Sequence, residues 1–170
     1  MPPNWQRQRL RIQALAPVAL TILLIFLSVT PLGLPYFGAV APLYGVIAVY
    51  YWSIYRPDLL PAPAVFAVGL LQDLLTGLPI GLSAMTFLAV HAVCVSQRRF
   101  FVGKSFGVGW WGFAVIALGA VSLSFIIATV FHVALLDPRP LLVQVVISIA
   151  VYPAFDWLFG RTEMTILRRA

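Results

Sequence analysis

The chain has 170 residues, of which 62% are hydrophobic and 9% are charged, and its formal net charge is +6. Its mean hydropathy is +0.99. Soluble domains carry about 25% charged and about 45–50% apolar residues, and a small soluble fold has too much surface for its volume to hide such an apolar excess. Intrinsic disorder is excluded by the same numbers. The composition therefore predicts an all-α, polytopic membrane protein, with residues 1–170 forming a single transmembrane domain.

Six apolar runs, each bounded by proline, glycine or charged residues, predict six transmembrane helices. A bilayer core about 30 Å thick needs about 20 apolar helical residues. In chain order, the predicted spans are residues 14–30, 36–55, 59–76, 80–96, 108–136 and 141–159. The fifth run is the longest. It starts with Trp110 and Trp111, which we expect at the membrane interface. It also carries a ridge of small residues, which either allows close helix packing or faces lipid: Ala120, Ser124 and Ala128.

The basic residues predict the orientation of these spans. If the N-terminus is cytoplasmic, ten of the eleven lysines and arginines fall on the cytoplasmic side, and only Arg139 falls outside. This bias agrees with the positive-inside rule, so we expect both termini in the cytoplasm. The basic start also resembles a signal peptide with a small-residue site at Ala39-Val40-Ala41. Because that site lies beyond the apolar stretch and precedes Pro42, we expect an uncleaved first span.

Residues that would build a catalytic, metal or cofactor site are sparse. The chain has no H-E-x-x-H, C-x-x-C or glycine-rich phosphate loop, no nucleophile elbow, and no basic, aromatic-lined face for nucleic acid. His91 and His132 are each either a ligand or proton relay, or a hydrogen-bonded packing residue. Cys94 has no internal disulfide partner, and we expect a small buried or lipid-facing side chain. We therefore predict a non-enzymatic protein without cofactor, metal or nucleic acid.

Two aspartates lie inside the predicted spans, where an ionisable side chain costs about 2.5–3.5 kcal/mol at the bilayer centre. Asp73 lies near the outer end of the third span, and Asp156 lies near the inner end of the sixth. Their depths differ by about 20 Å, which disfavours a two-carboxylate hydrolytic site. Asp73 either binds backbone donors of the next loop, or fixes the reversal at residues 77–81 together with Gln72 and shapes an outward-facing surface. Asp156 is either a functional carboxylate or a partly solvated one near Arg161.

Glycine and proline give these segments their expected shapes. Gly77 and Gly81 supply backbone freedom to the reversal, and Pro79 stiffens it. Pro153 is expected to kink the sixth helix and to free the carbonyl of Ile149. Gln144, nearer the outer end of that helix, is expected to form an interhelical hydrogen bond.

The run GLLQDLLTGLPIG, residues 69–81, closely resembles the signature of MreD, a family of rod-shape-determining membrane proteins of bacteria. The chain length, the short basic N-terminus and the six predicted spans are also similar to that family. The residues that match its main motif are Gly69, Gln72, Asp73, Gly77, Pro79 and Gly81. Pro153 and Asp156 match a looser pattern near the C-terminus.

The resemblance implies a non-enzymatic protein of the bacterial inner membrane that belongs to the cell-elongation machinery. It implies binding to an MreC-like bitopic protein. It also implies indirect association with an MreB-like filament, a RodA-like glycosyltransferase and a penicillin-binding transpeptidase, which together direct lateral peptidoglycan synthesis and rod shape. The implied fold is similar to the substrate-binding component of energy-coupling-factor transporters.

Two other functions stay open. The first is a solute-binding component of a vitamin transporter, which needs an outward-opening pocket. The residues expected near the level of that pocket are Tyr36, Gln72, Asp73 and Gln144. The second is an ion or proton transporter, which would use Asp73, His91, His132 and Asp156, although relays usually carry denser ionisable groups.

Overall fold

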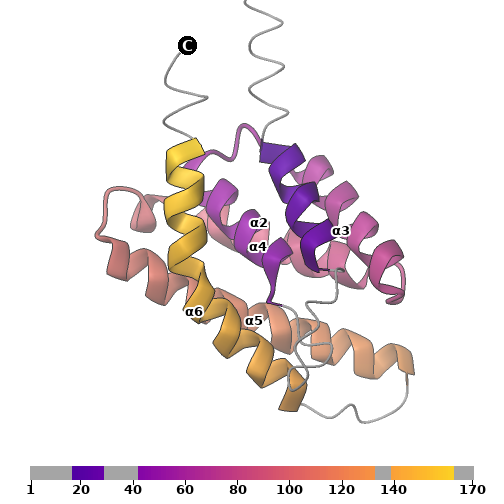
Figure 1. The fold of residues 1–170 in the computed structure, drawn as a ribbon. Coiled ribbons are helices and arrows are strands. Elements are labelled where there is room, and N and C mark those ends of the chain that lie inside the picture. Colours follow the sequence, from indigo (N-terminus) through magenta and orange to yellow (C-terminus); the bar gives the residue numbers. More distant parts are fainter. Residues whose placement is uncertain (1–16, 29–41, 133–138, 163–170) are drawn as a thin grey trace, which may run out of the picture.

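The computed structural model describes residues 17–28, 42–132 and 139–162, and these residues form six helices and no strand (Figure 1). The first helix is Pro17–Ser28. It is followed by α2 (Tyr44–Tyr55), α3 (Ala62–Thr76), α4 (Leu82–Phe101), α5 (Phe106–His132) and α6 (Arg139–Thr162). The predicted all-helical class is confirmed for these residues, with a helix at each of the six predicted positions.

Proline and glycine set the ends of α3 as their backbone preferences require. The helix follows the extended Pro61 and carries a proline in its first turn, where a missing N–H breaks no helical bond. It ends at Gly77, whose φ of 69° is left-handed. The backbone N–H groups of Gly77 and Leu78 both donate to the carbonyl of Asp73. This glycine-capped ending turns the chain sharply toward α4.

The core is built around α2, which has 11 of its 12 residues buried. Its Tyr50 ring lies 5.3 Å from the ring of Phe113 on α5 and 5.7 Å from that of Tyr152 on α6, and those two rings stack on each other at 4.5 Å. At about 1.5 Å per residue, α2 is about 18 Å long. The other helices surround α2, so its apolar residues are buried in the interior of the bundle.

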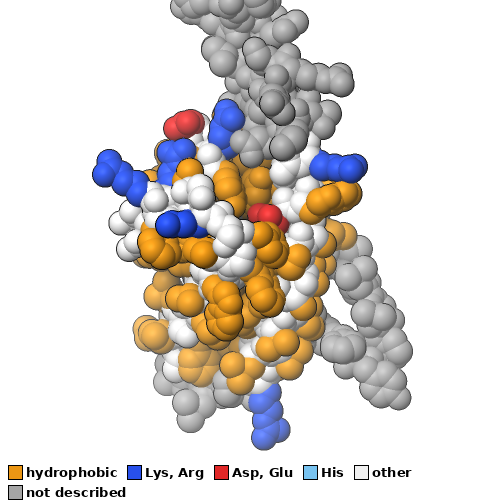
Figure 2. All heavy atoms as spheres, turned by 90° about the vertical axis from the view of Figure 1, so that its left-hand side faces the viewer, with side chains coloured by type: hydrophobic (Ala, Val, Ile, Leu, Met, Phe, Trp, Pro, Cys, Tyr) orange, Lys and Arg blue, Asp and Glu red, His pale blue; other side chains and the backbone are white. Residues whose placement is uncertain are grey.

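The outward faces of α5 and α6 are apolar, which is the reverse of a soluble helix bundle. On α5 the exposed face includes Trp111, 71% exposed, and Val130, 74% exposed. Hydrophobic side chains cover much of the surface between the two ends of the molecule (Figure 2). Phe106–Val130 and Arg139–Arg161 are long and apolar enough to cross a membrane.

The other predicted spans correspond to shorter or more polar helices. Pro17–Ser28 and Ala62–Thr76 are apolar, but each has fewer than 18 residues. The helix α4 has 20 residues, and its last turn contains Arg98 and Arg99. The predicted second span started at residue 36, whereas α2 starts at Tyr44, and residues 29–41 lie outside the described part. Six membrane crossings therefore remain a prediction.

The ends of α2, α4 and α6 meet, and this gives the molecule a basic end. Arg98 Nε donates to the carbonyl of Ile54 over 2.9 Å, and the Tyr51 ring lies 5.0 Å from that of Phe159. Figure 1 shows the helix Pro17–Ser28 beginning, and α6 ending, at this end. Figure 2 shows lysine and arginine side chains gathered there, with one at the opposite end. The residues of the basic end are Arg56, Arg98, Arg99, Lys104 and Arg161, whereas Arg139 begins α6 at the opposite end. This is the separation that the predicted orientation requires.

A proline inside α6 explains a hydrogen bond between α5 and α6. Figure 1 shows α6 changing direction along its length, and Pro153 lies inside it. Because Pro153 has no N–H, the Ile149 carbonyl loses its helical partner, as predicted, and Trp110 Nε1 donates to it over 2.9 Å. The indole N–H of Trp110 is thus used inside the bundle, whereas the side chain of Trp111 is exposed. Their placement at the membrane interface stays a prediction.

Candidate functional site

The most strongly determined polar feature is the corner where α3 meets α4, which we call the α3–α4 corner (residues 69–86). Asp73 is fully buried there. Its Oδ2 accepts the backbone N–H of Gly81 and its Oδ1 accepts that of Ser83, each over 2.8 Å. Gly81 precedes α4 and Ser83 is in its first turn, so the carboxylate caps the positive end of the α4 dipole from the neighbouring helix.

Glycines allow the corner to close. A Cβ on Gly69 would overlap the backbone of Ala84, so α3 and α4 touch at a point where only glycine fits. Gly77 and Gly81 both have positive φ, 69° and 102°. The Leu82 N–H donates to the carbonyl of Pro79 over 3.1 Å. Of the two alternatives for Asp73, bonding to backbone donors after the end of α3 is the one that the structure shows, and these bonds hold the reversal at residues 77–81.

Gln72 does not share that role. Its backbone carbonyl accepts the hydroxyl of Thr76 over 2.7 Å, whereas its side-chain Oε1 is buried without a hydrogen-bond partner. A Cβ on Gly45 would overlap both this oxygen and the ring of Phe87. Gly45 on α2 therefore lets the Gln72 amide lie close to α2. An unpaired buried acceptor is costly, which makes this oxygen a candidate contact for a bound molecule.

Gln72 lines a partly open cavity of about 340 Å³, whose other lining residues come mainly from α2, α4, α5 and α6. Most of its lining is apolar. Its polar side chains are Gln72, Ser83, Thr86, Ser124 and Gln144. Asp73 does not line the cavity, because both of its oxygens are used by the corner. An apolar chamber with a few convergent hydrogen-bonding groups is the usual form of a small-molecule site.

The small-residue ridge of α5 packs inward against α4 and this cavity. Ala120 is buried, and the hydroxyls of Ser124 and Thr86 lie 3.0 Å apart. Ala128 lines the cavity. Of the two alternatives for the ridge, close helix packing is therefore the one that the structure shows.

The residues matched near the C-terminus lie elsewhere. Pro153 and Asp156 are in the half of α6 that leads to the basic end, whereas the α3–α4 corner lies at the other end of the bundle. Tyr152 Oη donates to Asp156 Oδ1 over 3.2 Å, and the Arg161 guanidinium lies 4.4 Å above the Trp157 ring. The structure does not bring Asp156 to the Asp73 corner, as the predicted depths required.

The histidines and the cysteine show no shared site in the described residues. His91 Nδ1 lies 2.8 Å from Ser53 Oγ, in agreement with a hydrogen-bonded packing residue. Cys94 is buried. The side chain of His132, and all of Tyr36, lie outside the described residues. Within residues 17–28, 42–132 and 139–161, no group of three histidine, cysteine or acidic side chains is arranged to hold a metal ion.

Gly45 was not singled out from the sequence, because it sits in a long apolar run and its importance comes from residues that touch it across the bundle. Ser124 was named only as part of the small-residue ridge with Ala120 and Ala128, and its contact with Thr86 was not predicted. The cavity itself is a property of five packed helices, so no local pattern predicts it.

Comparison with known proteins finds no match for the chain among protein-family models, curated proteins or solved structures.

Proposed function

We propose that the protein is a multi-pass scaffold of the bacterial inner membrane, of the MreD type, that binds an MreC-like bitopic partner in the cell-elongation machinery. The observation that carries this proposal is the α3–α4 corner. The stretch that resembles the MreD signature, residues 69–81, is the stretch in which a buried carboxylate and two positive-φ glycines lock two helices together. A rigid corner of this kind suits a protein that acts by shape.

Membrane placement is supported by the surface of the bundle. The apolar outward faces of α5 and α6 would be unfavourable in water, and the described lysines and arginines gather at one end with a single exception. We therefore assign the basic end to the cytoplasm, with six crossings and both termini on that side. The α3–α4 corner then lies at the outer face of the membrane.

The partner surface that we propose is the exposed apolar rim of this corner. Leu74 is 68% exposed and Ile80 is 72% exposed, and Leu78 and Met85 are also exposed. These side chains surround the clamped turn, so their positions are fixed by the Asp73 bonds. A bitopic protein has one helix in the membrane and a domain outside it. Both parts can reach a surface that lies at the outer face of the membrane.

The test is capture of an MreC-like partner co-expressed in a rod-shaped bacterium, with cell shape scored in a strain depleted of its own copy. We expect Ile80→Gln to reduce capture by about tenfold or more and to round the cells, because a central interface side chain contributes about 2 kcal/mol or more. Val102→Gln is the matched control. Val102 is also an exposed aliphatic residue next to a helix end, but it lies at the basic end.

Comparing Ile80→Gln with Val102→Gln distinguishes the loss of a specific partner surface from the general effect of removing an exposed apolar side chain. Equal capture by wild type and Ile80→Gln would refute the proposed surface. No capture by any form of the protein, together with normal rods after depletion, would refute the scaffold function itself.

A second candidate function has one observation in its favour, the cavity with the unpaired Gln72 oxygen. A solute-binding component of a vitamin transporter needs such a chamber near the outer face. Mass spectrometry of the protein purified from cells tests this directly, because a stoichiometric small molecule is expected in wild type and is expected to be lost from Gln72→Leu. Ser122→Leu, on the exposed side of α5 and outside the lining of both cavities, is the control. A wild-type protein free of small molecules would discard this function.

A further inference from the structure

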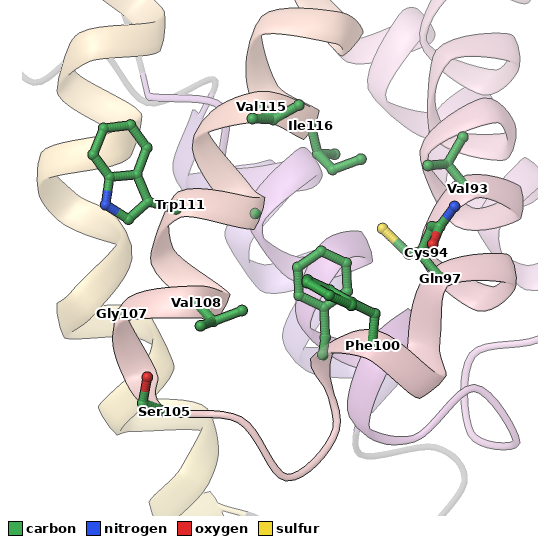
Figure 3. Close-up of a pocket in the computed structure, with 12 residues that line it drawn as sticks. Val93, Cys94, Gln97, Phe100, Ser105, Gly107, Val108, Trp111, Val115 and Ile116 are labelled. Carbon is green, nitrogen blue, oxygen red and sulfur yellow. The ribbon is translucent and has the colours of Figure 1, made fainter.

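A second and larger cavity opens between α4 and α5 at the basic end, and we call it the α4–α5 groove. Its volume is about 560 Å³. The close-up in Figure 3 shows Cys94 on α4 and Ile116 on α5 directed toward the gap from its two sides, with the Phe100 ring beside them. The lining is almost wholly apolar, and its polar side chains are limited to Gln97 and Ser105. A polar solute would find few hydrogen-bond partners here.

Apolar surface continues outward from the groove. Phe100, Trp111 and Val115 line it and are themselves exposed. In the proposed membrane placement these side chains face lipid, so the groove is open to the acyl-chain region of the bilayer. An apolar groove of this kind is filled by hydrocarbon at no cost in lost hydrogen bonds.

A basic residue lies beside the same groove, in the chain that joins α4 to α5. The chain between α4 and α5 passes along it, since Phe101 and Ser105 are both lining residues. Lys104 directly precedes the lining residue Ser105 and is exposed. Arg99 is also exposed, but it does not line the groove, and it lies on the opposite side of α4 from Gln97. Arg98 is held differently, because its Nε donates to the carbonyl of Ile54. The groove thus combines an apolar interior with positive charge at the level of the cytoplasmic headgroups.

We propose that the α4–α5 groove binds one anionic phospholipid of the cytoplasmic leaflet, with an acyl chain between the two helices and the phosphate group near Lys104. The charge at the rim and the hydrocarbon lining are separate requirements, and an anionic phospholipid satisfies both. Each exposed basic residue near the headgroup contributes about 1 kcal/mol to binding an anionic lipid. The inference rests on the membrane placement, but it does not depend on the MreC-like partner.

Two glycines of α5 offer a matched pair of variants. Gly107 lines the groove, and a Cβ there meets no atom within 4 Å, so Gly107→Leu puts a side chain into open space at the groove without strain. Gly119 is also open to a Cβ, but it does not line the groove. Gly119→Leu therefore adds the same apolar side chain to the same helix and leaves the groove unchanged.

The experiment is native mass spectrometry of the delipidated, detergent-solubilised full chain, titrated with phosphatidylglycerol or with phosphatidylcholine of the same acyl chains. For wild type and Gly119→Leu we expect one tightly bound phosphatidylglycerol and at least fivefold weaker phosphatidylcholine. We expect Gly107→Leu to lose this binding. Lys104→Ala is expected to weaken it by about fivefold, and Lys104→Arg is expected to restore it.

Three results would overturn the proposal. The first is equal binding of the two lipids by wild type, since the charge at the rim would then have no effect. The second is equal loss from Gly107→Leu and Gly119→Leu, or from neither, since the groove would then not be the site. The third is unchanged binding by Lys104→Ala. Extraction of the chain from cell membranes without detergent would instead refute the membrane placement, which separates that failure from a failure of the lipid site.

Discussion

Asp73 is the residue whose removal is expected to affect the free energy of unfolding most directly. Its two carboxylate oxygens accept the N–H groups of Gly81 and Ser83 at 2.8 Å in a fully buried setting. A hydrogen bond to a charged group contributes about 1.5–3 kcal/mol. Asp73→Ala removes both bonds and leaves two N–H groups unpaired at the start of α4. We therefore expect it to lower the free energy of unfolding by about 3–6 kcal/mol.

A graded series tests this reasoning. Asp73→Asn keeps one acceptor oxygen, so we expect about half of that loss, about 1.5–3 kcal/mol. The assay is unfolding of the purified protein in mixed micelles by increasing sodium dodecyl sulfate, followed by circular dichroism. Asp58 is exposed in the turn between α2 and α3, so Asp58→Ala and Asp58→Asn are the controls, with changes of about 0.5 kcal/mol or less. The reasoning is refuted if Asp73→Ala and Asp58→Ala unfold at the same detergent fraction.

Two further predictions use the same unfolding assay. Gly69→Ala is expected to lower the free energy of unfolding by about 1–3 kcal/mol, because its new methyl group would push against the backbone of Ala84 and separate α3 from α4. Trp110→Phe is expected to lower it by about 1–3 kcal/mol, because the Ile149 carbonyl loses its donor. In a Pro153→Ala background the residue at 153 supplies its own N–H to that carbonyl, so the effect of Trp110→Phe is expected to shrink.

Both predictions have internal controls. Gly119→Ala adds a methyl group to α5 where no atom lies within 4 Å, and we expect no loss, or a gain of about 0.5–1 kcal/mol from the better helix former. A loss from Gly119→Ala equal to that from Gly69→Ala would contradict the close-approach argument. For the indole bond, equal effects of Trp110→Phe with proline and with alanine at position 153 would show that the freed carbonyl is not the cause.

Local sequence patterns predicted the helical class and the approximate place of every helix in the described residues. In a long apolar run, the backbone N–H and C=O groups can hydrogen-bond only to one another, so the run forms a helix. Proline, glycine and arginine mark the helix ends. The role of Asp73 at the α3–α4 corner could be predicted from the sequence, because the carboxylate, the glycines and the turn lie close together in the chain. The freed carbonyl of Ile149 followed from Pro153 for the same reason.

The contacts between these helices, in contrast, could not be predicted from local patterns. Nothing local indicates that Trp110 supplies the Ile149 carbonyl, that Gly45 lies against the Gln72 amide, or that Ser124 reaches Thr86. In a chain this apolar, hydrophobicity varies little around each helix, so the pattern does not separate an inward from an outward face. The buried α2, the cavity beside Gln72 and the α4–α5 groove are decided by steric fit between side chains distant in sequence, and steric fit has no signature in a single chain segment.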